Sequence, residues 1–256
     1  MRAILTYHAL GGEESPITIP PEAFRRHVDG LLSRGVRVLP LKDLVRPPFE
    51  GDAVALTFDD GFVSFAEHAW PCLAERRLPV TVFVVSDAVG GNNAWGGVKT
   101  AGIPIAPLLQ WSELRDLARA GVTLGSHSRT HAYLPHLAEE EIEAEVAGAA
   151  ERIRSETGRP PEGFAYPYGG VDSRCAAVVR RHHEVAVTTE FDSLGAGLDP
   201  VLLPRIDSWY FRDGSRLDRF GTPSFRRYLR LRRTLRRART LLFGGHAPSR
   251  RGPIKG

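Results

Sequence analysis

Two carboxylates stand side by side in the segment Thr57-Phe58-Asp59-Asp60-Gly61, directly after a run of apolar residues. Neighbouring residues in a regular strand point to opposite faces, so a bend here could give the two aspartates separate roles. One could then bind a metal ion while the other accepts a proton. Asp-Gly is also a common turn pair, and on this motif alone a simple turn is the favoured interpretation.

Two histidines, His127 and His131, lie four residues apart in the segment Ser-His-Ser-Arg-Thr-His. On a helical turn this spacing places both imidazoles on one face, where their nitrogens suit a divalent metal. A pair of surface histidines is the alternative. Together with one aspartate they would form a metal site of two histidines and one carboxylate, with open coordination positions. Such a site fits a zinc hydrolase and also a non-haem iron enzyme. The alternation of strands and helices in this chain disfavours the iron alternative.

The segment Tyr166-Pro167-Tyr168-Gly169-Gly170 follows a short apolar run. Glycines let a ligand approach the backbone closely, and a free N–H group there could stabilise an oxyanion. Taken alone, a strand-to-helix turn is the preferred interpretation. A long connection over residues 86–110 carries Trp95, whose ring could contact a ligand or equally pack inside the loop.

The elements that must position these residues can be read from the hydrophobic pattern. Strands are predicted at 3–7, 36–39, 53–58, 80–85, 122–124, 163–166, 185–189 and 201–206, and helices at 21–34, 64–77, 111–120, 138–157 and 172–182. This alternation predicts an α/β protein with a closed, distorted (β/α) barrel. The polar residues named above follow strands, so they should converge on the face where the strands end.

The composition is that of an ordinary globular protein, with 42% hydrophobic and 25% charged residues among 256. The net charge is +4, but the segment from Phe225 to Phe243 holds eight arginines and no acid, which leaves the rest of the chain near −4. The basic character is therefore local, and no nucleic-acid partner is expected. The chain has only two cysteines, Cys72 and Cys175. This low number argues against a disulfide framework and against a zinc site built from thiolates.

We predict a single catalytic domain over residues 1–220 and a basic helical C-terminal tail over residues 221–256. In the tail, Phe225, Tyr228, Leu235, Ala238 and Leu242 fall near one helix face. This pattern predicts contact with an anionic membrane surface. A last helix packed on the barrel, with its arginines reaching water, is the alternative. The apolar run at the start of the sequence is too short for a signal peptide, so we expect a cytoplasmic location. Within the cytoplasm, we expect the protein to lie at the inner face of the membrane.

Taken together, TFDDG, SHSRTH and YPYGG resemble the polysaccharide deacetylase family (carbohydrate esterase family 4), over about residues 3–208. The Tyr7-His8 pair near the start is similar to the branch that acts on poly-N-acetylglucosamine and related exopolysaccharides. The resemblance implies a metal-dependent removal of N-acetyl groups from an amino-sugar polymer or oligosaccharide, with zinc as the expected metal. It also implies that Asp60, His127 and His131 bind the metal and that Asp59 is the catalytic base. The Tyr168 N–H would complete the oxyanion hole.

Two positions depart from the family pattern. Where many members have an arginine before Pro-Tyr-Gly, this chain has Ala165 and Tyr166, so Arg205 is predicted to orient Asp59 from a neighbouring strand, with Asp207 as its supporting partner. The C-terminal acid motif is also unclear. We predict that His8 is the general acid, with His246 as the competing candidate. Substrate contacts are assigned to Trp95, Tyr166 and Pro167.

Two other functions stay open for this sequence. One is a deacetylase or deformylase of a small or lipid-linked sugar. The other is a non-catalytic sugar-binding protein on a deacetylase scaffold, which the intact Asp and His set disfavours.

Overall fold

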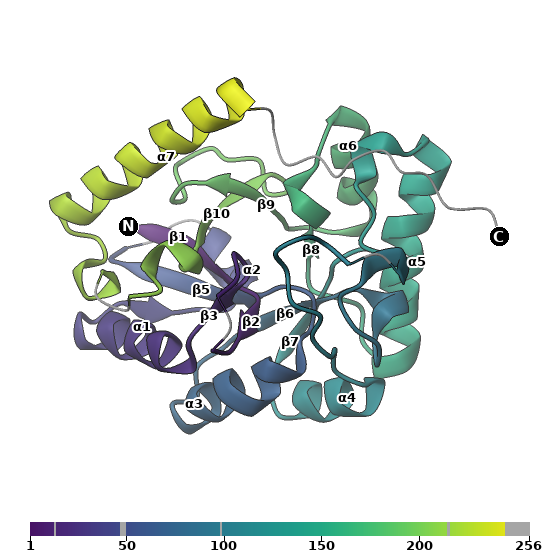
Figure 1. Ribbon diagram of the computed structural model, residues 1–256, viewed down its shortest axis with the longest axis horizontal. Helices are drawn as coiled ribbons and strands as arrows, with labels where there is room; N and C mark the ends of the chain where they lie inside the picture. The colour runs from purple at the N-terminus through teal and green to yellow at the C-terminus, as the bar shows by residue number, and fades with distance from the viewer. Residues whose placement is uncertain (13, 47–49, 98, 214–215, 244–256) are drawn as a thin grey trace.

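The computed structural model describes residues 1–12, 14–46, 50–97, 99–213 and 216–243, and their strands form a closed parallel barrel (Figure 1). β1 pairs with both β10 and β5, which closes a ring of seven strands, while β4 pairs with the first residues of β5 outside that ring. The predicted distorted (β/α) barrel is confirmed. Its strands are β1 (Arg2–Tyr7), β4 (Arg37–Val38), β5 (Ala53–Phe58), β6 (Thr81–Val84), β7 (Thr123–Ser126), β8 (Phe164–Ala165), β9 (Ala186–Phe191) and β10 (Leu203–Asp207).

Side chains alternate between the inside of the barrel and the layer under the helices, because successive residues of a strand point to opposite faces. Ile4, Ala55, Phe83, Val187 and Leu203 share one buried cluster, which fills the barrel. Phe83 fits because Gly125 faces it: a Cβ at that glycine would lie 2.3 Å from the Phe83 ring. The inward series of β1, β5 and β10 ends in polar residues, so the barrel interior leads directly to the candidate site.

Helices cover the outside of the barrel. They are α1 (Pro21–Ser33), α2 (Leu41–Val45), α3 (Trp70–Glu75), α4 (Trp111–Arg119), α5 (Glu139–Thr157), α6 (Ser173–His182) and α7 (Pro223–Phe243). The predicted helix at 64–77 contains a π-helical stretch, Phe65–Ala69, ahead of α3. Pro71 has no N–H group to donate, and a widened turn accommodates it. No helix among the described residues is long and apolar enough to cross a membrane.

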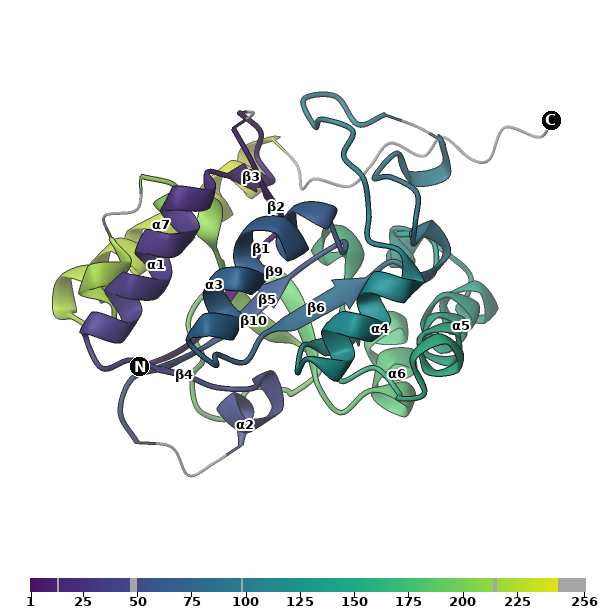
Figure 2. The ribbon, with the colours of Figure 1, turned by 90° about the horizontal axis from the view of Figure 1, so that it is seen from below.

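Two short strands were not predicted from the sequence, namely β2 (Ala9–Leu10) and β3 (Thr18–Ile19). They pair with each other in a small sheet of their own. Figure 2 shows β2, β3 and the long segment between β6 and α4 above the same end of the barrel. This end carries the carboxyl ends of the strands, so these segments surround the face where the site lies.

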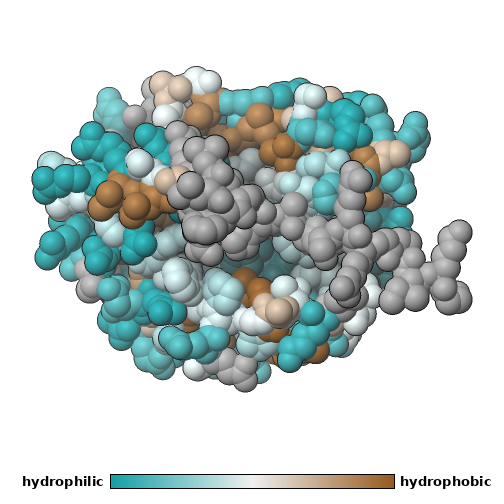
Figure 3. Space-filling view, turned by 45° about the horizontal axis from the view of Figure 1, so that its top comes forward, coloured by the Kyte–Doolittle hydropathy of each residue, from teal (hydrophilic) through white to brown (hydrophobic). Residues whose placement is uncertain are grey.

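The connection from β9 to β10 contains no helix, and α7 packs along this side of the barrel (Figure 1). Phe225 and Leu229 of α7 are buried, and Arg233 pairs with Asp192. The predicted membrane face is corrected in part, because Phe225 faces the protein whereas Leu235 is 53% exposed. In Figure 3, hydrophilic side chains cover much of the visible face, interrupted by a few hydrophobic patches.

Candidate active site

Three inward-facing residues meet where β1, β5 and β10 end. Asp59 continues the inward series of β5, Arg205 lies on β10, and His8 follows β1. Both oxygens of the Asp59 carboxylate accept hydrogen bonds from the two terminal nitrogens of Arg205, each at 2.7 Å. The His8 Nε2 atom lies 3.8 Å from Asp59 Oδ2. The structure therefore brings together the residues predicted as base, orienting arginine and acid.

Arg205 is itself held firmly. Its Nε donates to the Thr188 carbonyl at 3.0 Å, its Nη1 lies 3.4 Å from Thr57 Oγ1, and its side chain is 2% exposed. Burial alone would raise the pKa of Asp59, but the Arg205 guanidinium and the nearby His127 hold that pKa well below its usual range. The carboxylate is therefore charged at any neutral pH and fixed in one orientation.

Asp60 points away from Asp59 because the backbone turns sharply between them. Asp60 has φ +73° and Gly61 has φ +79°, so the strand ends in two left-handed residues. A positive φ is uncommon for a residue other than glycine, and residues in such conformations cluster at functional sites. The predicted bend between the two carboxylates is present.

Asp60, His127 and His131 form a buried cluster whose nearest ligand atoms all lie within 4.8 Å of one another. Asp60 Oδ1 lies 3.5 Å from the Nε2 atoms of both histidines. This oxygen and the His131 Nδ1 atom are buried without a hydrogen-bond partner in the described structure. Buried polar atoms are almost always paired, so a carboxylate oxygen that faces two imidazole nitrogens without a bond fits a shared cation.

The surroundings of the two imidazoles agree with that fit. His127 Nδ1 lies 2.7 Å from the Ala165 carbonyl oxygen, and this contact orients the ring so that Nε2 lies 3.5 Å from Asp60 Oδ1. Burial lowers the pKa of His131 well below its usual range, so His131 is neutral. Neutral imidazoles and a carboxylate are the forms in which these side chains bind a divalent metal.

The turn after β8 places Tyr168 beside this cluster. Tyr168 has φ +57°, and its ring packs edge-on against His131 with 4.5 Å between the ring centroids. Burial and the neighbouring Asp60 raise the pKa of Tyr168 to about 12, so its hydroxyl is neutral. A Cβ at Gly169 would lie 1.9 Å from Thr189 Oγ1, and the turn is therefore fixed by close packing.

The assignment of Tyr166 to substrate binding is wrong. Its side chain is fully buried in the cluster that also contains Phe164 and Val178, and its hydroxyl donates to the Val201 carbonyl at 3.1 Å. Pro167 is buried as well and starts the turn, so its side chain is also not placed for a substrate contact.

Trp95 and Asp207 also lie near the site. Trp95 is half-buried and stacks on the His131 ring, with 4.4 Å between the centroids. Asp207 accepts the Trp209 N–H at 3.0 Å; burial raises its pKa, and the charge of His8 opposes that rise. His246 lies outside the described residues.

One residue that sequence reasoning missed is Glu145 on α5. Its carboxylate accepts hydrogen bonds from Arg129 and Thr130, which lie between the two histidines of the cluster. The sequence offered only a faint signal, because Glu145 is one of several acids near the start of a helix.

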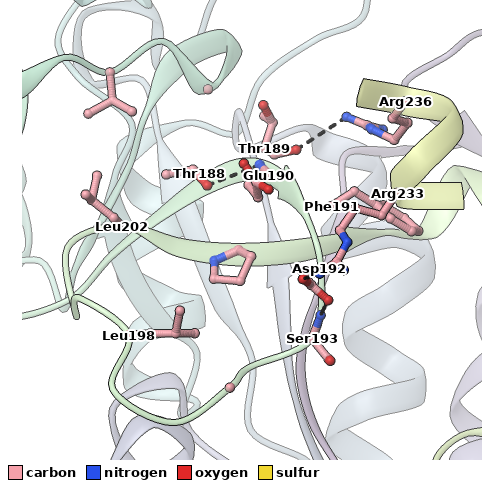
Figure 4. Close-up of a pocket in the computed structure, with 14 residues that line it drawn as sticks. Thr188, Thr189, Glu190, Phe191, Asp192, Ser193, Leu198, Leu202, Arg233 and Arg236 are labelled. Carbon is pink, nitrogen blue, oxygen red and sulfur yellow. Dashed lines mark hydrogen bonds and ion pairs between the residues drawn. The ribbon is translucent and has the colours of Figure 1, made fainter. Parts of the chain in front are cut away.

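A cavity of about 940 Å³ lies on another part of the surface, between β9, the connection to β10, and α7 (Figure 4). Its lining includes Leu198, Leu202 and Arg236, and Gly169 is its link to the turn of Tyr168. None of the residues assigned to catalysis, metal binding or substrate binding lines it. The residues assigned to the candidate site therefore lie at the strand ends and not in this cavity.

Comparison with known families identifies the family of this chain. The model of the family described as polysaccharide deacetylase matches residues 46–186, more than half of the chain. The chain belongs to the polysaccharide deacetylase family. The matched region of this deacetylase-family chain includes Asp59, Asp60, His127, His131 and Tyr168, whereas His8 and Arg205 lie outside it.

Relatives and solved structures extend the likeness. The chain is 23% identical to the Bacillus subtilis protein YxkH, named as a polysaccharide deacetylase, over 73% of this chain and 64% of the relative. The structure of IcaB from Ammonifex degensii has a TM-score of 0.69 and 22% identity, covering 85% of this chain and 97% of that one. A de-N-acetylase from Aggregatibacter actinomycetemcomitans has a TM-score of 0.66 and 16% identity, covering 89% and 99%. The deacetylase-family chain spans from a quarter to about two thirds of the length of the curated relatives that it matches.

Proposed function

We propose that this protein is a metal-dependent hydrolase that removes N-acetyl groups from an amino-sugar polysaccharide or oligosaccharide. The observation that carries the proposal is that two groups of residues lie together at the strand ends. One is the cluster of Asp60, His127 and His131, and the other is the ion pair of Asp59 with Arg205. Zinc is the metal we expect, since two imidazoles and one carboxylate leave positions open for a water and a substrate oxygen.

When bound, the cation would polarise the amide carbonyl and make the attacking water more acidic. Asp59 is placed to take the proton of that water, because Arg205 keeps its carboxylate charged and directed at the site. The backbone N–H of Tyr168 would donate to the developing oxyanion from the turn that Gly169 fixes. Trp95 would border the sugar, because it lies over His131.

The leaving amine needs a proton, and we assign its delivery to His8. His8 lies on the inward series of β1, and its side chain is 25% exposed, so a substrate can reach it. The assignment is tested by comparing His8→Ala with His246→Ala on an amide substrate and on an activated acetate ester, whose leaving group needs no proton. We expect His8→Ala to impair amide cleavage strongly and ester cleavage little. A silent His8→Ala beside a rescuable defect in His246→Ala would reject the assignment.

The substrate is supported only by names of similar proteins. Two curated relatives from Saccharomyces cerevisiae are named chitin deacetylases, and one structural neighbour is a de-N-acetylase. Contact of α7 with an anionic membrane, a cytoplasmic location and the division of the chain at residue 220 stay predictions.

The proposal is tested by acetate release from chitooligosaccharides and from lipid-linked amino sugars, with and without added zinc. Cleavage of the oligosaccharides only with metal supports it. Cleavage of the lipid-linked sugar alone favours the alternative of a deacetylase that acts on a lipid-linked sugar. A sugar-binding protein would bind the oligosaccharides and release no acetate at any metal concentration.

A further inference from the structure

Glu145 reaches from α5 to the loop that carries the two histidines of the metal cluster. Its side chain is buried, with 8% of its surface exposed. Its Oε2 accepts the backbone N–H groups of Arg129 and Thr130, each at 3.0 Å, and its Oε1 accepts the Thr130 hydroxyl at 2.8 Å. Within the described residues, all three of these hydrogen bonds go to this one loop.

The loop between His127 and His131 needs such support. Ser128 has φ +63° and His131 has φ +62°. Each left-handed residue of this kind costs on the order of 1–3 kcal/mol and persists only where its surroundings fix it. Two consecutive N–H groups donate to one carboxylate oxygen, which holds the backbone between the two histidines in a single shape.

Packing alone does not account for a carboxylate at this position. The neighbouring inward residues of α5 are apolar: Ile142, Val146 and Ala149 are all buried. A charged group among them is costly unless it is fully hydrogen-bonded, so an apolar residue would serve the helix equally well. The bonds to the loop are therefore the contribution that the carboxylate makes.

We propose that Glu145 is a positioning residue that sets the relative placement of His127 and His131 and thereby the metal affinity of the site. This inference rests on the proposed function, because it requires that the cluster with Asp60 binds a divalent metal. Partners behind metal ligands typically account for about 10–100-fold in metal affinity or activity.

The test measures Co²⁺ and Zn²⁺ binding to the full chain by competition with a chelator, together with the visible absorption of the Co²⁺ form. Glu145→Leu keeps the volume and removes the acceptors, whereas Glu145→Gln keeps an oxygen for both N–H groups and lets the Thr130 hydroxyl turn and accept. Glu145→Asp keeps the charge and shortens the reach, and it serves if the leucine variant does not fold. The matched control is Glu151→Gln on the exposed face of the same helix, where Glu151 pairs with Arg154.

We expect Glu145→Leu and Glu145→Asp to bind metal about 10–100-fold more weakly, with an altered Co²⁺ spectrum. Glu145→Gln should stay close to the wild type, and Glu151→Gln should be unchanged. Folded leucine and aspartate variants with wild-type affinity and spectrum would overturn the inference while the proposed function stands. A wild-type chain that binds neither metal would overturn the proposed function first.

Discussion

The two halves of the candidate site differ in how completely their polar atoms are paired. Asp59 and Arg205 come from strand ends and satisfy each other through two bonds of 2.7 Å. Asp60, His127 and His131 lie on strained turns, and atoms of Asp60 and His131 are buried without partners in the described structure. The first half is complete within the chain itself, whereas the second has the form expected of ligands for a cation. Substitutions should therefore affect the two halves in different ways.

The largest effect is expected from His127→Ala. Removal of a ligand should weaken metal binding by more than about 100-fold, since even residues behind the ligands account for about 10–100-fold. Turnover should be lost with the metal. Elemental analysis of the purified variant checks this, and wild-type metal content would remove His127 from the cluster.

Asp59→Asn tests the other half of the site, because it should impair catalysis without removing the metal. We expect turnover to fall by about 10²–10⁴-fold, the usual contribution of a general base, while the metal stays bound. The measurement is kcat on an acetylated oligosaccharide beside metal analysis of the same preparation. If the variant lost its metal too, the division between the two halves would be wrong.

Arg205→Lys tests whether the stability of the ion pair with Asp59 depends on the two parallel hydrogen bonds of the guanidinium or only on its charge. Lysine cannot make both bonds to Asp59, so we expect a loss of about 1.5–3 kcal/mol in the free energy of unfolding, the contribution of one hydrogen bond to a charged group. Urea unfolding measures this, and metal affinity should stay unchanged. An unaltered unfolding midpoint would mean that the bidentate geometry contributes little.

His183 sharpens the comparison, because both its ring nitrogens are also buried without partners in the described structure, yet it is not part of the metal cluster. Burial lowers the pKa of His183 to about 4 from an ordinary value of 6.5. The unfolded chain therefore takes up a proton that the folded chain refuses, and stability falls as the pH drops from about 6.5 towards 4.

His183→Leu should remove this part of the acid sensitivity, on the order of 1–3 kcal/mol at pH 4, and should leave metal content unchanged. Unfolding curves between pH 7 and pH 4 measure the difference. His27 should keep some acid sensitivity in the variant, because burial also lowers its pKa to about 4. A parallel pH dependence in variant and wild type would place the titrating groups elsewhere.

Much of the fold could be predicted because buried parallel strands are continuous apolar runs, and each of the eight predicted strand segments overlaps an observed strand. His8 and Asp59 directly follow predicted strands, so their convergence at one end of the barrel could also be predicted. Asp and His adopt a positive φ more often than most residue types, but only a small share of them do so, and the sequence does not identify Asp60 and His131 as such residues.

The errors have a common physical origin. Tyr166 lies two residues before Tyr168, which packs against His131, but packing against Phe164 and Val178 buries Tyr166, and that contact depends on where α6 lies. Glu145 stands among five glutamates in residues 139–145, and only the direction in which α5 faces distinguishes it from the others. Both outcomes depend on tertiary packing, which local sequence does not encode.

Barrel closure by β1 also bears on the order in which a newly made chain can assemble its site. Asp59 and Arg205 are 146 residues apart, and β10 must dock beside β1 before they can meet. A chain that emerges from the ribosome amino end first therefore presents Asp60, His127 and His131 well before Arg205 is available. Contacts across such separations form slowly. The buried Asp59 carboxylate obtains its counter-charge only when the ring of strands closes, so the proposed active site should become complete only at the last step of folding.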